Sequence, residues 1–481
     1  MTDFEDLTRR AAPLEPDAAE RDRLFELARS HVAAFLEGLP DAPAFLAGPQ
    51  VLARRHEADF PEAGRDAADV LAYVRDCVDA PGITAASPRF MGYIPGGGLF
   101  HSAIADLLAA TANKYSAYVP AAPGAALIEN TVMSWLAGAA GYPDTAAGVL
   151  CSGGSLATLT AVVVARDARD AAGGGVVYAT RFTHHCVDKA LHIAGRGAAP
   201  RRMIETDARR RMSVEALGQA IERDLAAGLK PWLVVASAGT TDTGSIDPLE
   251  AIADLCARYG VWLHVDGAYG GLFRLCPEGQ AILTGMERAD SLVLDPHKTL
   301  FLPYGAGAAL VRDGRLLHAS FSASAAYMMQ SSEADVGPSP SDLGPELTRH
   351  FRALRLWLPL QLAGVAAFRA ALSEKLALAQ RLHARLSALD GFDAGPPPDL
   401  SVVAFRYRPK NGDANRFNEQ LLAKLQDEGR VFLSGTRIDG DLYLRAAILS
   451  FRTHVQHVDE LVDALVPSVE ELQATRFADK P

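Results

Sequence analysis

GVWLHVDGAYG at residues 260–270 and DSLVLDPHK at residues 290–298 are the stretches that decide the fold. In both, aliphatic and β-branched residues follow one another without polar alternation, and turn residues end the apolar run. This pattern is typical of strands that are buried on both faces of a parallel sheet. GVVYAT (175–180) and PWLVVASAG (231–239) share the pattern, and amphipathic helical segments separate the four stretches. The sequence therefore predicts an α/β domain with a mainly parallel sheet covered by helices on both faces.

Segments of different character flank this domain. Residues 1–86 have helical spacing of apolar positions interrupted by prolines, which predicts an N-terminal helical segment. We expect the large α/β domain over residues 87–374 and a small C-terminal α+β domain over residues 375–481. Residues 320–346 are rich in Ser, Pro and Gly without a clear period, which indicates a long loop.

Composition and charge narrow the function classes. The 481 residues include 47 Lys+Arg and 58 Asp+Glu, a net charge of −11 that repels nucleic acid. The five cysteines are dispersed and lack zinc-like spacing, so we expect reduced thiols and no metal site. The acidic start is unlike a secretory signal, and the apolar run at 156–165 is too short to cross a membrane. These features favour a cytoplasmic protein without a membrane or nucleic-acid partner.

A Gly-Gly-Ser turn opens a helical segment at residues 151–169, CSGGSLATLTAVVVARDAR. Glycines let the backbone approach a ligand closely, and the free N–H groups at a helix start bind anions. Gly154 and Ser155 are therefore candidates for a phosphate site. Because glycine and serine are also ordinary residues at a helix start, this turn alone does not identify a ligand.

Two charged residues follow buried strands of the same predicted sheet, where α/β proteins bind their ligands. Asp266 follows VWLHV, and its carboxylate needs a partner there, either a protonated heterocyclic nitrogen or a neighbouring arginine. Lys298 follows SLVLDPH, and burial can lower the pKa of such an amine and make it a nucleophile toward aldehydes. A single lysine is usually a surface residue, but an anion site, a carboxylate and a nucleophilic lysine together are what pyridoxal phosphate requires.

Six motifs in order carry a resemblance to a known family. They are SPRFMGYIP (87–95), SGGS (152–155), TRFTHHCVDKA (180–190), SAGTTDTGSID (237–247), WLHVDGAYG (262–270) and DPHK (295–298). Over roughly residues 60–460 the sequence resembles the group II pyridoxal-phosphate-dependent amino-acid decarboxylases, which include the aromatic-L-amino-acid and glutamate decarboxylases. The resemblance implies the type I pyridoxal-phosphate-dependent transferase fold, with pyridoxal 5'-phosphate as cofactor and an amino-acid substrate. It also implies a homodimer whose N-terminal helices interlock.

The resemblance implies roles for matching residues. Lys298 matches the Schiff-base lysine, Asp266 matches the aspartate that holds the pyridine nitrogen, and His184 matches the histidine that stacks on the ring and can transfer protons. The positions that match cofactor-binding residues are Gly154, Ser155, His184, Thr241, Asp266, Ala268, His297 and Lys298. Tyr93 and Pro95 match positions that line the substrate pocket, although plain core residues would look the same.

One departure from the resembling family concerns the proton donor, which is commonly a tyrosine on a loop that reaches the neighbouring subunit's site. Residues 331–346 contain no tyrosine, and counting back from LTRHFRALRLW puts the family's tyrosine near Pro340. Tyr327 lies upstream and could serve through a shifted loop, but it equally fits a packed aromatic residue. His184 is a second candidate for the donor.

Three functions remain open from the sequence. The first is decarboxylation of an L-amino acid to the amine and carbon dioxide, with an aromatic substrate favoured because FMGYIP (90–95) is apolar. The second is an oxygen-dependent decarboxylating aldehyde synthase on the same scaffold, which the missing tyrosine makes plausible. The third, a catalytically silent homologue, is disfavoured because Lys298, Asp266 and His184 occur together. Arg445 matches a family arginine that could approach the substrate, although a structural arginine fits equally well.

Overall fold

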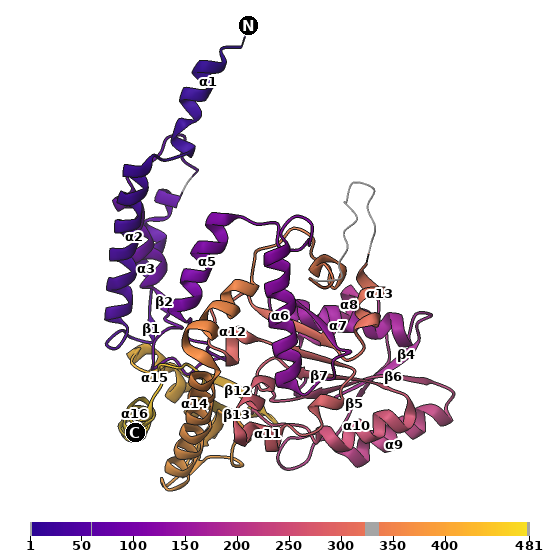
Figure 1. Cartoon of the computed structure of the whole chain (residues 1–481). Coiled ribbons are helices and arrows are strands. Elements are labelled where there is room, and N and C mark those ends of the chain that lie inside the picture. Colours follow the sequence, from indigo (N-terminus) through magenta and orange to yellow (C-terminus); the bar gives the residue numbers. More distant parts are fainter. Residues whose placement is uncertain (1, 59, 323–335, 479–481) are drawn as a thin grey trace.

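The computed structural model describes residues 2–58, 60–322 and 336–478. A helical N-terminal segment extends away from an α/β body, and a smaller C-terminal unit packs against that body (Figure 1). The large sheet runs in the order β3-β9-β8-β7-β6-β4-β5. Its strands are β3 (Ala147–Cys151), β4 (Gly175–Ala179), β5 (Arg201–Met203), β6 (Lys230–Ser237), β7 (Trp262–Gly267), β8 (Ser291–Leu294) and β9 (Gly307–Val311).

The sheet is parallel except at β9, which pairs antiparallel with both β3 and β8. The four strands predicted from continuous apolar runs are confirmed as β4, β6, β7 and β8. The sequence analysis missed β3, β5 and β9. β9 reads GAALV, and small residues give it a weaker apolar signal, although it is fully buried between two neighbours.

Helices cover both faces of this sheet, as expected. On one face, α7 (Gly154–Arg169), α8 (Cys186–Ile193) and α13 (Gly314–Phe321) bury apolar residues in a shared core. On the other face, α6 (Pro123–Ala140), α9 (Val214–Ala226), α10 (Leu249–Tyr259) and the first part of α14 (Ala353–Ser387) form a second core. Residues of β6 alternate between the two cores: Val234 belongs to one and Val235 to the other. The α/β class is therefore confirmed.

The C-terminal unit is α+β. Its antiparallel sheet has the order β10-β11-β13-β12. The strands are β10 (Phe392–Asp393), β11 (Val402–Tyr407), β12 (Ser434–Ile438) and β13 (Asp441–Ala447), and the helices are α15 (Ala414–Glu428) and α16 (Val455–Ala478). α14 runs through the expected boundary at residue 375, but its side chains change cores there: Leu376 packs in the large unit and Leu378 in the small one. The division at residues 87 and 375 stays a prediction.

The N-terminal segment differs from the rest of the chain. It contains α1 (Phe4–Ala11), α2 (Ala18–Gly38), α3 (Pro49–Ala53), α4 (Ala67–Val74) and the short strands β1 (Phe45–Leu46) and β2 (Gly82–Ile83). No residue of α1 or α2 is buried.

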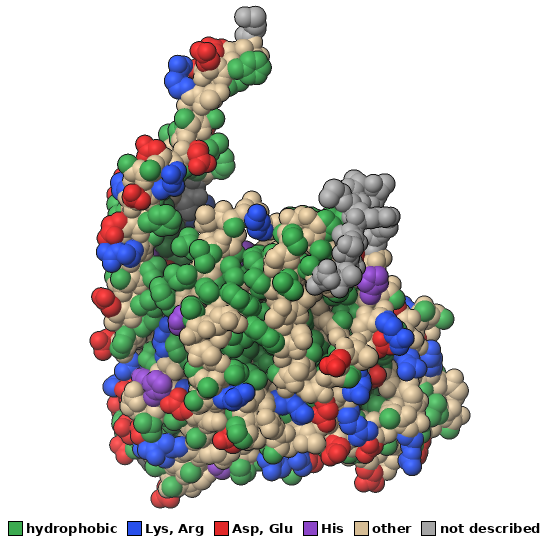
Figure 2. Space-filling model, viewed as in Figure 1, with side chains coloured by type: hydrophobic (Ala, Val, Ile, Leu, Met, Phe, Trp, Pro, Cys, Tyr) green, Lys and Arg blue, Asp and Glu red, His purple; other side chains and the backbone are tan. Residues whose placement is uncertain are grey.

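Apolar side chains gather on the face formed by α5 (Phe100–Ala112), α6 and α14, as Figure 2 shows. The exposed members there are Phe100, Ile104, Leu107, Leu108, Leu127, Trp135 and Leu362.

α14 is the helix in the described part of the chain that is long and apolar enough to cross a membrane. It is longer than the apolar run at 156–165, which lies within α7. Pro359 lies inside it, and Gly364 breaks its helical geometry at φ 72° and ψ 152°. Because its buried side chains join the cores of both units, we identify α14 as a core helix.

Candidate active site

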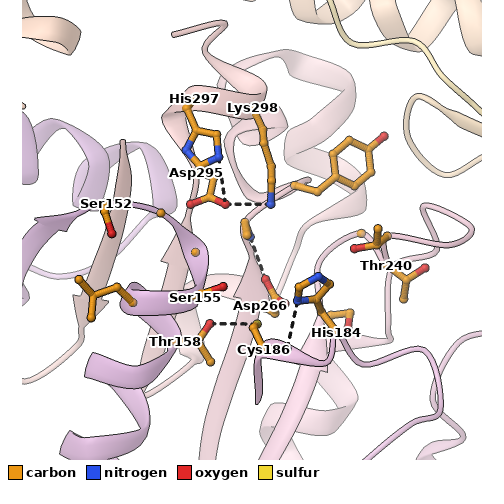
Figure 3. A pocket seen from close by; sticks show the side chains of 18 of the residues that line it. Ser152, Ser155, Thr158, His184, Cys186, Thr240, Asp266, Asp295, His297 and Lys298 are labelled. Carbon is orange, nitrogen blue, oxygen red and sulfur yellow. Dashed lines mark hydrogen bonds and ion pairs between the residues drawn. The ribbon is translucent and has the colours of Figure 1, made fainter. Parts of the chain in front are cut away.

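A cavity of about 370 Å³ lies at the carboxyl ends of the parallel strands. Figure 3 shows its side chains converging from the start of α7, the segment before α8, the end of β7 and α12 (Pro296–Thr299). Eight residues proposed from the sequence line it, namely Gly154, Ser155, His184, Thr241, Asp266, Ala268, His297 and Lys298. Five of the six motifs therefore contribute to this cavity, although they are widely separated in the sequence.

The start of α7 forms one wall of the cavity. Its N-cap residue, Gly153, provides no side-chain acceptor for the first N–H groups of the helix, and Ser155 is exposed toward the cavity. A Cβ atom on Gly154 would lie 2.7 Å from an oxygen of Asp295, so a side chain there would force the cavity wall apart. This start therefore has the unused donors and the close backbone approach that an anion site needs.

Asp266 lies at the carboxyl end of β7, between the buried neighbours β6 and β8. One carboxylate oxygen accepts a hydrogen bond from the backbone N–H of Ala268 at 3.1 Å, which orients the side chain. Asp266 is only partly buried because it borders the cavity. It is therefore in a position to meet a cationic group of a ligand.

Lys298 forms an ion pair with Asp295, with 2.8 Å between Nζ and a carboxylate oxygen. Burial lowers the pKa of this amine, but the carboxylates of Asp295 and Asp266 outweigh burial, so the pKa lies above its ordinary value. The sequence suggested that burial can lower the pKa of Lys298; burial does act in that direction, but the net shift is upward. The reason is Asp295, a cavity residue that the sequence analysis quoted within DPHK but did not single out.

His184 stands beside Asp266 and Lys298 in the cavity (Figure 3). Its Nδ1 accepts a hydrogen bond from the backbone N–H of Cys186 at 3.2 Å, which leaves Nε2 to face a ligand. Burial lowers the pKa of His184, and the nearby Asp266 opposes this only in part. The ring of His185 lies 4.2 Å away between centroids, so the two imidazoles are in contact.

His297 is held by its backbone and by its ring. Its Nδ1 lies 2.6 Å from the carbonyl oxygen of Ala306, and its Nε2 lies 3.8 Å from Asp295. Burial lowers the pKa of His297. The ring of Tyr304 meets His297 edge-on at 5.9 Å, and Tyr304 also lines the cavity. The sequence analysis missed Tyr304, for which the chain offers no signal beyond its position six residues after Lys298.

Three other residues named from the sequence do not line this cavity. Tyr93 is exposed with φ 49°, and Pro95 is buried in the neighbouring loop. Arg445 is buried at β13 and donates to the carbonyl of Thr241 at 2.6 Å, so it supports the cavity wall from behind. Cys186, another residue that the sequence analysis missed, does line the cavity, and burial raises the pKa of its thiol to about 12.

The two loop positions discussed for the proton donor have different outcomes. Pro340 is buried in a short helical turn over Pro340–Asp342. Next to it, the hydroxyl of Ser339 accepts a hydrogen bond from the backbone N–H of Val119, and the backbone N–H of Ser341 donates to the carbonyl of Ala117. Pro340 is not part of the cavity wall. Tyr327 lies outside the described residues.

The donor set fits pyridoxal 5'-phosphate. The start of α7 has free N–H donors for a phosphate, Asp266 has a carboxylate for the ring nitrogen, and Lys298 has a primary amine for the aldehyde carbon. Oδ1 of the buried Asp295 has no hydrogen-bond partner in the described chain, as expected for a site that a ligand completes.

Comparisons with known proteins agree with this fit. Residues 49–408 match the model of the pyridoxal-dependent decarboxylase conserved domain. The chain is 36% identical over 429 residues to aromatic-L-amino-acid decarboxylase of Bacillus atrophaeus, covering 88% of this chain and 89% of that protein. It is 30% identical over 423 residues to phenylacetaldehyde synthase of Arabidopsis thaliana, covering 83% and 86% respectively.

Among solved structures, the crystal structure of Oryza sativa TDC with PLP and tryptamine superimposes with a TM-score of 0.89 at 27% identity. That match covers 95% of this chain and 99% of the rice protein. The fold, the cavity and the extent of these matches all indicate the same family. The chain belongs to the pyridoxal-dependent decarboxylase family, whose members decarboxylate amino acids with pyridoxal phosphate.

Proposed function

We propose that this pyridoxal-phosphate-dependent decarboxylase converts an aromatic L-amino acid to the corresponding amine and carbon dioxide. The observation that carries the proposal is the meeting of Lys298, Asp266 and the start of α7 in one cavity. Similarity to an aromatic-L-amino-acid decarboxylase supports the substrate class. The purified chain, screened against amino acids for carbon dioxide release, should prefer Phe, Tyr or Trp over Glu and Asp.

Named residues would hold the cofactor in this cavity. Gly154 and Ser155 would bind its phosphate, Asp266 its ring nitrogen, and Lys298 would bind it covalently, while Thr241, Ala268 and His297 border the remaining space. When bound, pyridoxal phosphate supplies an electron sink for the pair left behind when the carboxyl group departs. Asp266 would keep the ring nitrogen protonated and so strengthen that sink.

Proton transfer is the second task of the chain. His184 is mostly neutral near pH 7 because burial lowers its pKa below the ordinary value of 6.5. It could therefore accept at Nε2 the proton that the substrate's ammonium group loses, and donate that proton to the α carbon after carbon dioxide has left. Tyr327 is the other candidate, since Pro340, near which the resembling family has its tyrosine, carries no acidic hydrogen. Tyr327→Phe tests this choice: a large loss of amine formation would identify Tyr327, and unchanged turnover would identify His184.

An aromatic substrate fits the cavity walls. Phe182, Tyr304 and Leu156 give this cavity apolar surface. Among the described residues that line it, the cations are Lys298 and, when protonated, His184 or His297. An acidic side chain would therefore lack a permanently charged partner in this cavity. Tyr93 and Pro95 remain proposed pocket residues, since their loop packs on the cavity: a Cβ on Gly96 would lie 2.0 Å from the carbonyl oxygen of His297.

A second candidate function is oxygen-dependent aldehyde formation. Similarity to a phenylacetaldehyde synthase favours keeping it beside amine formation. The two are separated by product analysis with an aromatic amino acid in air and without oxygen. Amine under both conditions supports the decarboxylase, whereas aldehyde and peroxide that appear only in air support the synthase.

We also propose that the chain is a cytoplasmic homodimer. The apolar face of α5, α6 and α14 in Figure 2 supports a dimer, because exposed apolar area of this extent usually marks an interface. The unburied helices α1 and α2 fit a segment that packs on a second copy. All five cysteines are free and buried, which agrees with a reducing compartment. Sedimentation should give twice the chain mass, and Leu108→Glu with Leu127→Glu should shift the species toward a monomer.

A further inference from the structure

β3 is the edge strand of the large sheet on one side, and β9 is its only neighbour among the described strands. In an antiparallel ladder, alternate residues direct their N–H and C=O groups away from the paired strand. Leu150 of β3 uses these groups to bond to two side chains. Its N–H donates to Oε1 of Glu129 at 3.3 Å, and its C=O accepts from Nη1 of Arg349 at 2.7 Å. Two side chains thus take the place of a further strand at this edge.

Glu129 on α6 and Arg349 before α14 also bond to each other. Oε1 of Glu129 lies 2.5 Å from Nη2 of Arg349, and the two side chains are only 2% and 1% exposed. α6 lies close enough to β3 for this contact because Gly148 has no side chain, and a Cβ there would collide with Met133 of α6. Burying two charges is costly, and here the pair satisfies backbone groups that are closed to water.

The Gly-Gly-Ser turn that would bind the phosphate begins two residues after Leu150. β9 supports this turn from the inner side, since a Cβ on Gly307 would lie 2.6 Å from the backbone of Gly153. The bonds of Glu129 and Arg349 to Leu150 support it from the outer side. Neither Glu129 nor Arg349 lines the cavity, so any effect on the cofactor passes through the backbone of β3.

We propose that Glu129 and Arg349 are positioning residues for the phosphate of the cofactor. By fixing Leu150, they set the direction of the free N–H groups at the start of α7. Hydrogen bonds weaken steeply when donor and acceptor are misaligned, so a small shift of this turn weakens phosphate binding. The inference rests on the proposed function only in that the phosphate binds at Gly154 and Ser155.

The other end of the cofactor is held independently of this pair. Asp266 would bind the ring nitrogen from the end of β7, and Lys298 would bind the aldehyde carbon from α12. In the described chain, neither of them bonds to Glu129 or Arg349. Loss of the pair should therefore weaken binding of the phosphate and leave binding of the ring unchanged.

Pyridoxal, which lacks the phosphate, separates the two ends of the cofactor. The cofactor-free full chain is titrated with pyridoxal 5'-phosphate and with pyridoxal, and the absorbance of the bound compound gives the two dissociation constants. Glu129→Leu with Arg349→Met removes both charges and both bonds to Leu150. This double variant should bind pyridoxal 5'-phosphate at least about tenfold more weakly than the wild type, and pyridoxal within about threefold of it.

Asp170→Leu with Arg196→Met is the matched control. These residues also form a buried ion pair at 2.8 Å, and Asp170 accepts a hydrogen bond from the backbone N–H of Gly175 at the start of β4. Neither lines the cavity. The control should keep the wild-type phosphate preference, which is the dissociation constant of pyridoxal divided by that of pyridoxal 5'-phosphate, even where its unfolding midpoint falls. A lower preference in the control would overturn the inference, because it would reflect general loosening of the sheet.

The remaining outcomes distinguish the inference from the proposed function. Equal weakening of both compounds in the Glu129 and Arg349 double variant, or no change in either, would overturn the inference and leave the function intact. A wild type without phosphate preference would overturn the proposed phosphate site and the inference together.

Arg349→Lys tests the same point if the double variant does not fold. The buried charge of Glu129 stays paired in this variant, but the planar fork that reaches Leu150 and Glu129 together is lost. Its phosphate preference should fall by about threefold or more. An unchanged preference would equally overturn the inference.

Discussion

Asp224 and Asp295 are both buried carboxylates paired with a cation, one between α9 and the β4–β5 edge and one in the cavity. Asp224 accepts hydrogen bonds at both oxygens, from the hydroxyl of Tyr178 at 2.8 Å and from Arg202 at 2.6 and 3.1 Å. Asp295 bonds to Lys298 through one oxygen and has an unused oxygen beside it. The comparison shows that the structural carboxylate uses both of its oxygens, whereas the carboxylate in the cavity keeps one oxygen without a partner, where a ligand can bind.

The largest difference in turnover between the two pairs should appear when the cation is removed from each. Lys298→Ala should lower turnover by about 10⁴-fold or more, because the covalent bond to the cofactor is lost. Arg202→Ala should leave kcat within about twofold, since Arg202 lies outside the cavity. Carbon dioxide release and the absorbance of bound cofactor check both variants. Steady turnover by Lys298→Ala would refute the role assigned to this lysine.

A second prediction concerns Asp266, the other carboxylate of the cavity. Asp266→Asn should lower kcat by about 10³-fold, because an amide does not hold a proton on the ring nitrogen. The thermal unfolding midpoint should change little, since the carboxylate makes one backbone hydrogen bond that the amide oxygen can also accept. A kcat within tenfold of wild type would contradict this role.

A third prediction concerns the pH dependence of activity that His184 should cause. Because burial lowers its pKa, the neutral imidazole should predominate above pH 6.5, and activity should fall only as the pH drops below that value. A profile of kcat/KM against pH should therefore place the acid limb below 6.5. His184→Gln should remove this limb and lower kcat by about 10²-fold. An acid limb above 6.5 that persists in the variant would assign it to another group.

The smallest expected effect is on stability. Asp224→Asn should lower the free energy of unfolding by about 1–3 kcal/mol near pH 7, because it removes charge from a saturated hydrogen-bonded pair. Burial raises the pKa of Asp224, but the bonds from Arg202 and Tyr178 lower it by more, so the folded-state pKa is below 3.8. This contribution is present above pH 3.8 and is lost as the pH falls through the lowered pKa.

Denaturant titration at pH 7 and at pH 3 checks the sign, and the difference between the wild type and Asp224→Asn should be smaller at the lower pH. Asp295→Asn should cost less stability than Asp224→Asn at pH 7, since one of its oxygens makes no hydrogen bond. An equal or larger loss for Asp295→Asn would mean that the two carboxylates are alike after all.

Much of the fold was predictable from local pattern. The continuous apolar runs of β4, β6, β7 and β8 predicted buried parallel strands, because few other structures place such runs between amphipathic helices. β9 escaped prediction because small residues suffice for a strand that is buried between β8, the strand before it in the chain, and the remote β3. The apolar character of α14 was also missed, because Arg and Gln residues interrupt its apolar runs although its mean hydropathy is high.

For the site, residue type and strand ends were enough to propose Gly154, Ser155, Asp266 and Lys298, and the cavity brings them together. The sequence analysis undervalued Asp295, although it precedes Lys298 by three residues in a quoted motif. Its importance depends on burial by Gly154 at the start of α7 and by Gly307 at the start of β9. Tyr93 and Pro95 were proposed for the pocket, and they lie beside the cavity rather than in its wall.

By itself, then, the sequence determined which segments become buried strands and which reactive groups stand at their ends, because hydrophobic periodicity and turn residues act over a few neighbouring positions. Only the tertiary structure decided which groups meet, and with what charge. Burial and electrostatic interaction are sums over neighbours that are remote in the chain. The raised pKa of Lys298, the single bonded oxygen of Asp295 and the exposed apolar face all arise from such neighbours.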